Sequence, residues 1–137
     1  MSAAAGYSGT PLVRKLGFKA GMRAHYANAP DDFGALVDEL PGGVRVLARP
    51  AAGLDLVMLF VRKRRDLERR LPGLHGKLAS DGMIWVAWPK RASGVATDMT
   101  EDVVRDVALP RGLVDVKVCA IDATWSGLKL VTRRELR

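Results

Sequence analysis

A polar segment with two adjacent cations follows an apolar run near the middle of the chain. The run Met83–Trp88 reads as a buried strand, and Pro89 ends it because proline has no backbone N–H for a sheet ladder. In α/β proteins, ligands gather beyond the carboxyl ends of strands. The cations and hydroxyls of this segment predict an anion clamp for phosphate or carboxylate. The candidate residues are Lys90, Arg91, Ser93 and Thr97. The alternative is a solvated loop that only links a strand to a helix.

Asp122 and Trp125 lie in a short turn near the C-terminus. If the strand before this turn runs parallel to Met83–Trp88, the turn lies at the same sheet edge as Lys90. Trp125 would then form a stacking wall for a flat ligand, and Asp122 would accept a hydrogen bond from it. The alternative, which we favour for these two side chains, is that Asp122 holds the turn and the indole covers the core.

A second group of cations begins at the end of another apolar run, Leu54–Val61. With a formal net charge of +7, the chain favours anionic partners. Phosphate contacts here would make the segment a nucleic-acid interface. The alternative is a solvated helix face, because Asp66 and Glu68 are interspersed. The candidate nucleic-acid residues are Arg62, Lys63, Arg64 and Arg65, with Arg69 and Arg70 further along the same helix.

Soft metal ligands are few, and no catalytic motif is present. His25, His75 and Cys119 are the histidines and the cysteine of the chain, and none has metal-site spacing to another. We therefore expect no metal and no cofactor. A small enzyme remains an alternative, with Asp122 or His25 as acid–base and Lys90 holding an anion.

Strand and helix patterns alternate along the chain. This alternation predicts an α/β fold: three layers, with a mainly parallel sheet of about six strands and helices on both faces. A C-terminal antiparallel hairpin should add an edge strand. Predicted strands are 22–28, 44–48, 54–61, 83–88, 113–121 and 128–132, and predicted helices are 10–16, 31–40, 64–79 and a last one that begins at Asp98 or Thr100 and ends at Ala108.

The length of 137 residues fits one domain with one core. We expect a disordered tail over residues 1–9 and a single α/β domain over 10–137. No apolar run is long enough to span a bilayer, and residues 1–10 lack the features of a signal peptide. With one cysteine, which suits a reducing compartment, these features predict a cytoplasmic protein without membrane contact.

Several segments resemble an uncharacterised bacterial family that is catalogued as a domain of unknown function. The resemblance extends from about residue 10 to the end of the chain, and it implies one compact bacterial domain. It is carried by Leu12–Gly17, Trp85–Lys90, Gly112–Asp122 and Trp125–Leu128.

The order of elements from Leu54 onward is also similar to the second half of the class I methyltransferase fold. Such enzymes bind the methyl donor at a glycine-rich turn after their first strand. The corresponding turn here, residues 28–32, has no glycine, and Asp31 and Asp32 stand at a helix N-terminus, where they would repel an anion. The resemblance is therefore to a truncated fold that lacks the donor loop.

Together these features predict a cytoplasmic, non-catalytic binding or regulatory domain. It would recognise a small anionic ligand or a protein partner at the carboxyl edge of its sheet. The small enzyme and the nucleic-acid accessory protein are the alternatives.

Overall fold

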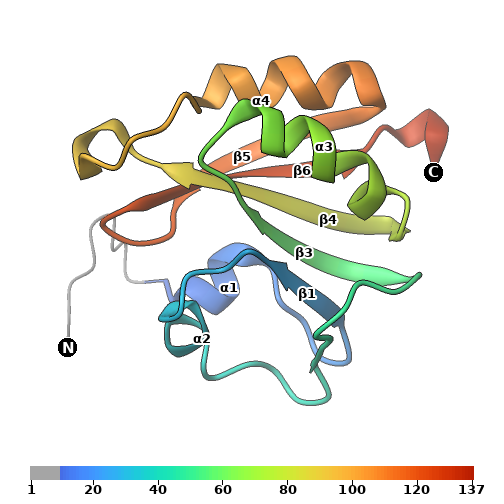
Figure 1. Ribbon diagram of the computed structural model, residues 1–137. Helices are drawn as coiled ribbons and strands as arrows, with labels where there is room; N and C mark the ends of the chain where they lie inside the picture. Colours follow the sequence, from blue (N-terminus) through green and yellow to red (C-terminus); the bar gives the residue numbers. More distant parts are fainter. Residues whose placement is uncertain (1–9) are drawn as a thin grey trace.

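The computed structural model describes residues 10–137 (Figure 1). The predicted tail, residues 1–9, lies outside the described residues. The described part forms one six-stranded sheet in the order β2-β1-β3-β4-β6-β5. Its strands are β1 (Arg23–Ala27), β2 (Arg45–Val46), β3 (Leu54–Phe60), β4 (Leu78–Pro89), β5 (Leu113–Ala120) and β6 (Trp125–Thr132).

Strand directions confirm a mainly parallel sheet with an antiparallel C-terminal hairpin. β1 pairs in parallel with β2 and β3, and β3 pairs in parallel with β4. The strand β6 pairs antiparallel with both β4 and β5. The hairpin adds an edge strand, as predicted, and β6 inserts between β4 and β5. The edge strand is therefore β5, and it runs in the same direction as β4.

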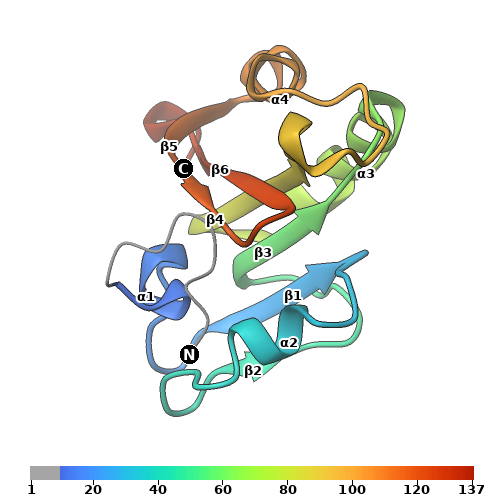
Figure 2. The same ribbon diagram turned by 90° about the vertical axis from the view of Figure 1, so that its left-hand side faces the viewer.

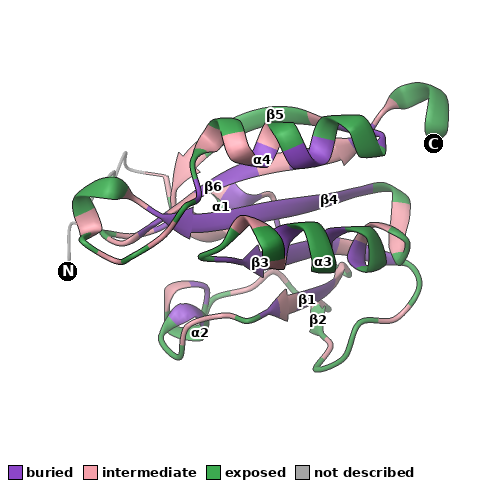
Figure 3. Ribbon diagram, turned by 45° about the horizontal axis from the view of Figure 1, so that its top comes forward, coloured by how far each residue is buried: buried purple, intermediate pink, exposed green. Residues whose placement is uncertain are grey.

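Helices cover both faces of the sheet, which gives the predicted three layers (Figures 1 and 2). The helices α3 (Arg64–His75) and α4 (Glu101–Ala108) pack on one face. The short helices α1 (Leu12–Leu16) and α2 (Phe33–Leu36) lie on the other. Since β3 and β4 lie inside the sheet with helices on both sides, all residues of β3 except Asp55 and residues 82–89 of β4 are buried, as their apolar sequences predict (Figure 3).

Trp85 shows how α1 is fixed to the sheet. Its side chain is fully buried beneath α1, and its Nε1–H donates a hydrogen bond to the carbonyl oxygen of Leu16 at 2.8 Å. The register of β4 against β3 pairs Trp85 with Met58, so both belong to the same central part of the sheet. The strand that ends at the predicted site is thereby held rigidly.

Several predicted element boundaries are wrong. The helix α2 is a single turn rather than 31–40, which fits the weak helix propensity of Gly34 within it. The helix α3 ends at His75 rather than at residue 79, and it contains Pro72. Residues 80–82, predicted as a turn, lie within an irregular part of β4, where a Cβ on Gly82 would come 2.7 Å from the carbonyl oxygen of Leu54.

The start of α4 resolves a choice that the sequence left open. The Thr100 side chain caps this helix and accepts a hydrogen bond from the Val103 amide at 3.1 Å. Asp98 is therefore free for another role. Among residues 10–137, no helix is long and apolar enough to cross a membrane.

Candidate functional site

Three chain segments meet at the carboxyl edge of the sheet. The parallel strands β3 and β4 both end there, and β5 ends there too because it runs in the same direction (Figure 2). The Lys90 amide donates a hydrogen bond to the carbonyl oxygen of Thr124 at 2.7 Å, which joins the end of β4 to the turn after β5. Lys90 and Asp122 thus lie at the same end of the sheet, which is the condition for a site that contains both.

The segment from Lys90 to Thr100 is tied down on this edge by its own hydroxyls and carboxylate. Thr97 Oγ1 donates to the carbonyl oxygen of Arg62 at 2.6 Å. Asp98 Oδ1 accepts from the Arg64 amide at 2.8 Å, so it satisfies one of the free amides at the start of α3. Both contacts bind the segment to the chain that leaves β3. The segment is therefore held against this part of the chain at two consecutive residues.

A cavity of about 710 Å³ lies between this segment, the end of β4 and the start of α4. Its volume falls in the range of small-molecule sites. Three of the six predicted ligand-binding residues line it: Lys90, Arg91 and Thr97. The remaining lining residues are Trp88, Gly94, Val95, Ala96, Asp98, Met99, Thr100, Glu101 and Ser126.

The charges around the cavity favour an anion. Within residues 10–137, neither Lys90 nor Arg91 forms an ion pair. Of the two carboxylates of the lining, Glu101 pairs with Arg105, whereas Asp98 accepts from the Arg64 amide and keeps its charge, so two cations face one uncompensated carboxylate. The lining therefore keeps a net positive charge for a ligand.

Neutral donors add to this charge. In the described chain, the indole Nε1–H of Trp88 donates to no protein group, and neither do the backbone amides of residues 96–98 and 100. Hydrogen bonds from such fixed amides to an anion are charge-assisted and strong. The cavity thus combines two cations with a set of unused donors.

A second, shallower cavity of about 420 Å³ lies on the other side of the same segment. Thr97 and Asp98 belong to both cavities, and Lys63 and Arg65 supply the charge of the second one. The described residues offer no carboxylate partner to Arg62, Lys63 or Arg65, whereas Arg64 pairs with Glu68 and Asp106. Three of the four predicted nucleic-acid residues are thus unpaired and exposed.

Ser93, Asp122 and Trp125 do not line the cavity, which corrects the predicted set. Ser93 Oγ donates to the carbonyl oxygen of Lys90 at 2.6 Å and so closes the turn after β4. Asp122 Oδ1 accepts from the amides of Thr124 and Trp125, both at 2.8 Å, as the turn-holding alternative predicts. The Trp125 ring is buried and meets Phe60 edge-to-face.

His25, the other acid–base candidate of the enzyme alternative, lies inside the sheet. Its side chain is buried, and Nδ1 lies 2.8 Å from the carbonyl oxygen of Leu47, to which it donates. In the described chain, no three His, Cys, Asp or Glu side chains gather in a way that could hold a metal ion.

Trp88, Thr100 and Ser126 line the cavity but are absent from the predicted set. Trp88 belongs to the apolar run, which predicts a core residue, and most of its surface does lie in the core. Ser126 reaches the cavity only because β6 pairs with β4 and places it opposite Trp88. The strand order that brings it there has no local signal in the sequence.

The strand order also marks a second place where α/β proteins bind ligands. The chain leaves β1 toward β2 on one side and reaches β3 on the other, so the crevice between the carboxyl ends of β1 and β3 is a topological switch point. Here Asn28, with φ 58°, donates from Nδ2 to the carbonyl oxygen of Phe60 at 3.1 Å. Phe33 is buried over the same strands, with ring centroids 4.9 Å from Tyr26 and 5.0 Å from Phe60.

Solved structures with a similar fold are methyltransferases and related proteins. A SAM-dependent methyltransferase from Aquifex aeolicus matches with a TM-score of 0.62 and 13% identity, over 87% of this chain and 86% of that chain. A TehB-like SAM-dependent methyltransferase from Corynebacterium glutamicum matches with a TM-score of 0.59 and 12% identity, over 94% and 91%. Fibrillarin from Aeropyrum pernix, solved with S-adenosyl-L-methionine, matches with a TM-score of 0.57 and 14% identity, over 89% and 69%.

The residues at the switch point do not fit the S-adenosyl-L-methionine that this fold implies. The Asn28 side chain and the Phe33 ring occupy the crevice, and the turn 28–32 has no glycine that would let a ligand approach the backbone. Residues 47–53, which follow β2, carry no carboxylate that could bind a ribose hydroxyl. The likeness is therefore one of fold.

Family membership rests on most of the chain. No curated protein matches this sequence. Residues 28–134 match the family described as protein of unknown function, DUF3052. This match covers three of the four segments that carry the resemblance seen in the sequence, and the fourth, Leu12–Gly17, lies before it. The chain belongs to the DUF3052 family, and it has the six-stranded Rossmann-like fold of the class I methyltransferases.

Proposed function

We propose that the protein is a cytoplasmic, non-catalytic binding domain that recognises a small anionic ligand at the carboxyl edge of its sheet. The observation that carries this proposal is the cavity beyond β4, where Lys90 and Arg91 have no ion-pair partner among the described residues. A phosphate-bearing ligand fits best, because cations and backbone amides together bind phosphate oxygens.

Among the described residues, neither acid–base candidate of the enzyme alternative lies beside the cations, which supports a non-catalytic role. Asp122 uses one carboxylate oxygen to hold its own turn, and His25 is buried with Nδ1 on a backbone carbonyl. A general acid or base must reach the proton it transfers, within hydrogen-bond distance or through one water. Neither group lines the cavity that holds Lys90.

Thermal unfolding with inorganic pyrophosphate tests the proposal. A ligand at about 100 times its Kd stabilises the native state by about 2.7 kcal/mol, which for a domain of this size raises Tm by roughly 8 °C. The double variant Lys90→Met/Arg91→Gln should lose this rise. Arg49→Gln, an exposed arginine on the loop before β3, is the control and should keep it. Equal rises in all three proteins, or none in the wild type, would contradict the proposal.

A nucleic-acid interface is the second candidate, because Arg62, Lys63 and Arg65 are exposed without partners beside the shallower cavity. Phosphate contacts release counterions, so binding to DNA or RNA should weaken steeply as salt rises. Neutralising these three residues should weaken binding and flatten its salt dependence. Undetectable binding of the wild type to single- and double-stranded DNA and RNA at about 50 mM salt would end this candidate.

A further inference from the structure

The edge strand β5 leaves one side of its backbone open. Among residues 10–137 it pairs only with β6, and residues 115–118 are exposed (Figure 3). The Ile121 amide donates to the carbonyl oxygen of Trp125 at 2.9 Å. Because ladder bonds alternate in an antiparallel pair, Lys117 and Cys119 bond to β6, whereas the N–H and C=O groups of Val118 and Ala120 point outward.

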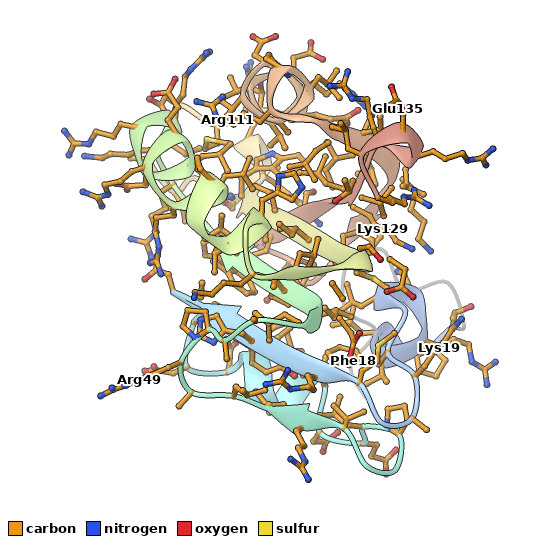
Figure 4. The ribbon with its side chains drawn as sticks, turned by 90° about the vertical axis from the view of Figure 1, so that its right-hand side faces the viewer. Phe18, Lys19, Arg49, Arg111, Lys129 and Glu135 are labelled. Carbon is orange, nitrogen blue, oxygen red and sulfur yellow. The ribbon has the colours of Figure 1, made fainter. Side chains whose placement is uncertain are left out.

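A cluster of three lysines lies beside this open edge, on the face that carries α1. Lys117 on β5 stands directly opposite Lys129 on β6, an arrangement that is destabilising for like charges. Lys19, which follows α1, lies on the same side of the molecule as Lys129 (Figure 4). Burial lowers the pKa of Lys129, and the charges of Lys117 and Lys19 lower it further.

No carboxylate compensates this cluster within the described residues. Lys19, Lys117 and Lys129 form no ion pair there. The nearest acid on β5, Asp115, lies on the opposite face, because its register partner is Leu130, and it pairs with Arg105 of α4 at 2.8 Å. The α1 face of the hairpin therefore presents positive charge alone.

Protection of the edge against aggregation explains only part of this arrangement. A charged residue and a bulge on an edge strand discourage pairing with other chains, and Lys117 and the irregularity at Val116 are of this kind. Lys129 is different, since β6 has neighbours on both sides and needs no such protection. Lys129 is half-buried on an inner strand and faces Lys117 on the edge strand, and this arrangement indicates a missing anionic partner.

We propose that the open edge of β5 and the three lysines form a docking surface for an extended, acidic segment of another protein. The segment would pair as a further strand with Val118 and Ala120, and its carboxylates would lie over Lys117 and Lys129. Exposed Val116 and Val118, at 50% and 43% of their full accessible surface, offer apolar contact. A second copy of this chain fits poorly, because its net charge of +7 would bring lysines against lysines.

Fluorescence anisotropy with a labelled peptide of about eight alternating valine and glutamate residues, the length of β5, tests this proposal. We expect saturable binding to the wild type and much weaker binding of a peptide with glutamine in place of glutamate. Lys129→Met and Lys117→Met should each weaken binding by about fivefold, as for an exposed ion pair, and Arg49→Gln should not.

A proline substitution in β5 tests whether the peptide pairs with the backbone of the open edge. Val118→Pro removes one outward N–H and no bond to β6, so it should abolish binding, while Val118→Ala should keep it. The proposal is overturned if the wild type does not bind the glutamate peptide, or if Val118→Pro and Lys129→Met both bind it as tightly as the wild type. It is also overturned if light scattering shows a dimer of the wild type that Val118→Pro dissociates, because a second copy then occupies the edge.

Discussion

Trp125 separates two accounts of the carboxyl edge: it is either a core residue or a wall of the ligand site. Its side chain is 7% exposed, and its ring lies edge-to-face on Phe60 with centroids 5.1 Å apart and planes at 86°. The indole packs with the α1 and α2 face of the sheet rather than the cavity beside Lys90. Replacing Trp125 with alanine should therefore destabilise the fold and leave the chemistry of the cavity intact.

The expected loss follows from the buried area. A tryptophan buries about 150–250 Å², and at about 25 cal/mol per Å² this is worth about 4–6 kcal/mol. The figure is an upper estimate, because the unfolded chain already buries some apolar surface. Trp→Ala exchanges in cores cost about 3–5 kcal/mol. We therefore expect a loss of about 4 kcal/mol for Trp125→Ala and roughly 1–2 kcal/mol for Trp125→Phe, which keeps an aromatic ring against Phe60.

Urea unfolding followed by far-ultraviolet circular dichroism measures this loss without depending on tryptophan fluorescence. The slope m should stay unchanged, so that the midpoint reports stability alone. Val116→Ala, an exchange of an exposed valine, is the control and should stay within about 0.5 kcal/mol of the wild type. The account is refuted if Trp125→Ala costs under about 1 kcal/mol, or if folded Trp125→Phe loses pyrophosphate binding.

Three further predictions each concern one side chain, that of Asp98, His75 or Tyr26. Asp98→Ala removes the carboxylate that accepts from the Arg64 amide, so the free energy of unfolding should fall by about 1 kcal/mol, as for a lost helix cap. An unchanged midpoint of urea unfolding would refute this role of Asp98. Burial lowers the pKa of His75 below its ordinary value of 6.5, so the unfolded chain takes up the proton first and stability should fall as pH drops below 6.5. His75→Gln should reduce that fall, measured as Tm against pH, and an identical profile would contradict it. The hydroxyl of Tyr26 is buried without a partner in the described chain, and burial raises its pKa to about 12. Tyr26→Phe removes this unpaired hydroxyl, so it should raise the free energy of unfolding by about 1 kcal/mol. A clear loss of stability in urea unfolding would contradict this prediction.

The central strands were predictable because burial on both faces leaves a clear mark in the sequence. Leu54–Phe60 and the end of β4 are nearly all apolar, and the connection between them is long enough for a crossover helix, which predicts parallel pairing. The sequence also predicted that Lys90 and Asp122 share one edge if the strand before Asp122 runs in the direction of β4, as β5 does. The structure confirms the pairing and the shared edge.

The parts that could not be predicted depend on tertiary contacts. Nothing local to β6 reveals that it inserts between β4 and β5, and this insertion brings Ser126 to the cavity and leaves β5 at the edge. Asp122 and Trp125 have the residue types of a ligand site, yet two amides and the Phe60 ring engage them. The residue types therefore indicated which edge of the sheet carries the candidate site. Only the tertiary contacts show which side chains at that edge are engaged within the protein.

Amide and indole NMR shifts during titration with pyrophosphate test the central claim most directly, because they report where on the sheet edge an anion binds. The account predicts saturable shifts at the amides of residues 96–98 and 100 and at the indole N–H of Trp88, all of which are unused donors beside Lys90 and Arg91. These shifts should vanish in Lys90→Met/Arg91→Gln. Saturable shifts at residues 28–33, the turn at the switch point, or the absence of any saturable shift would contradict it.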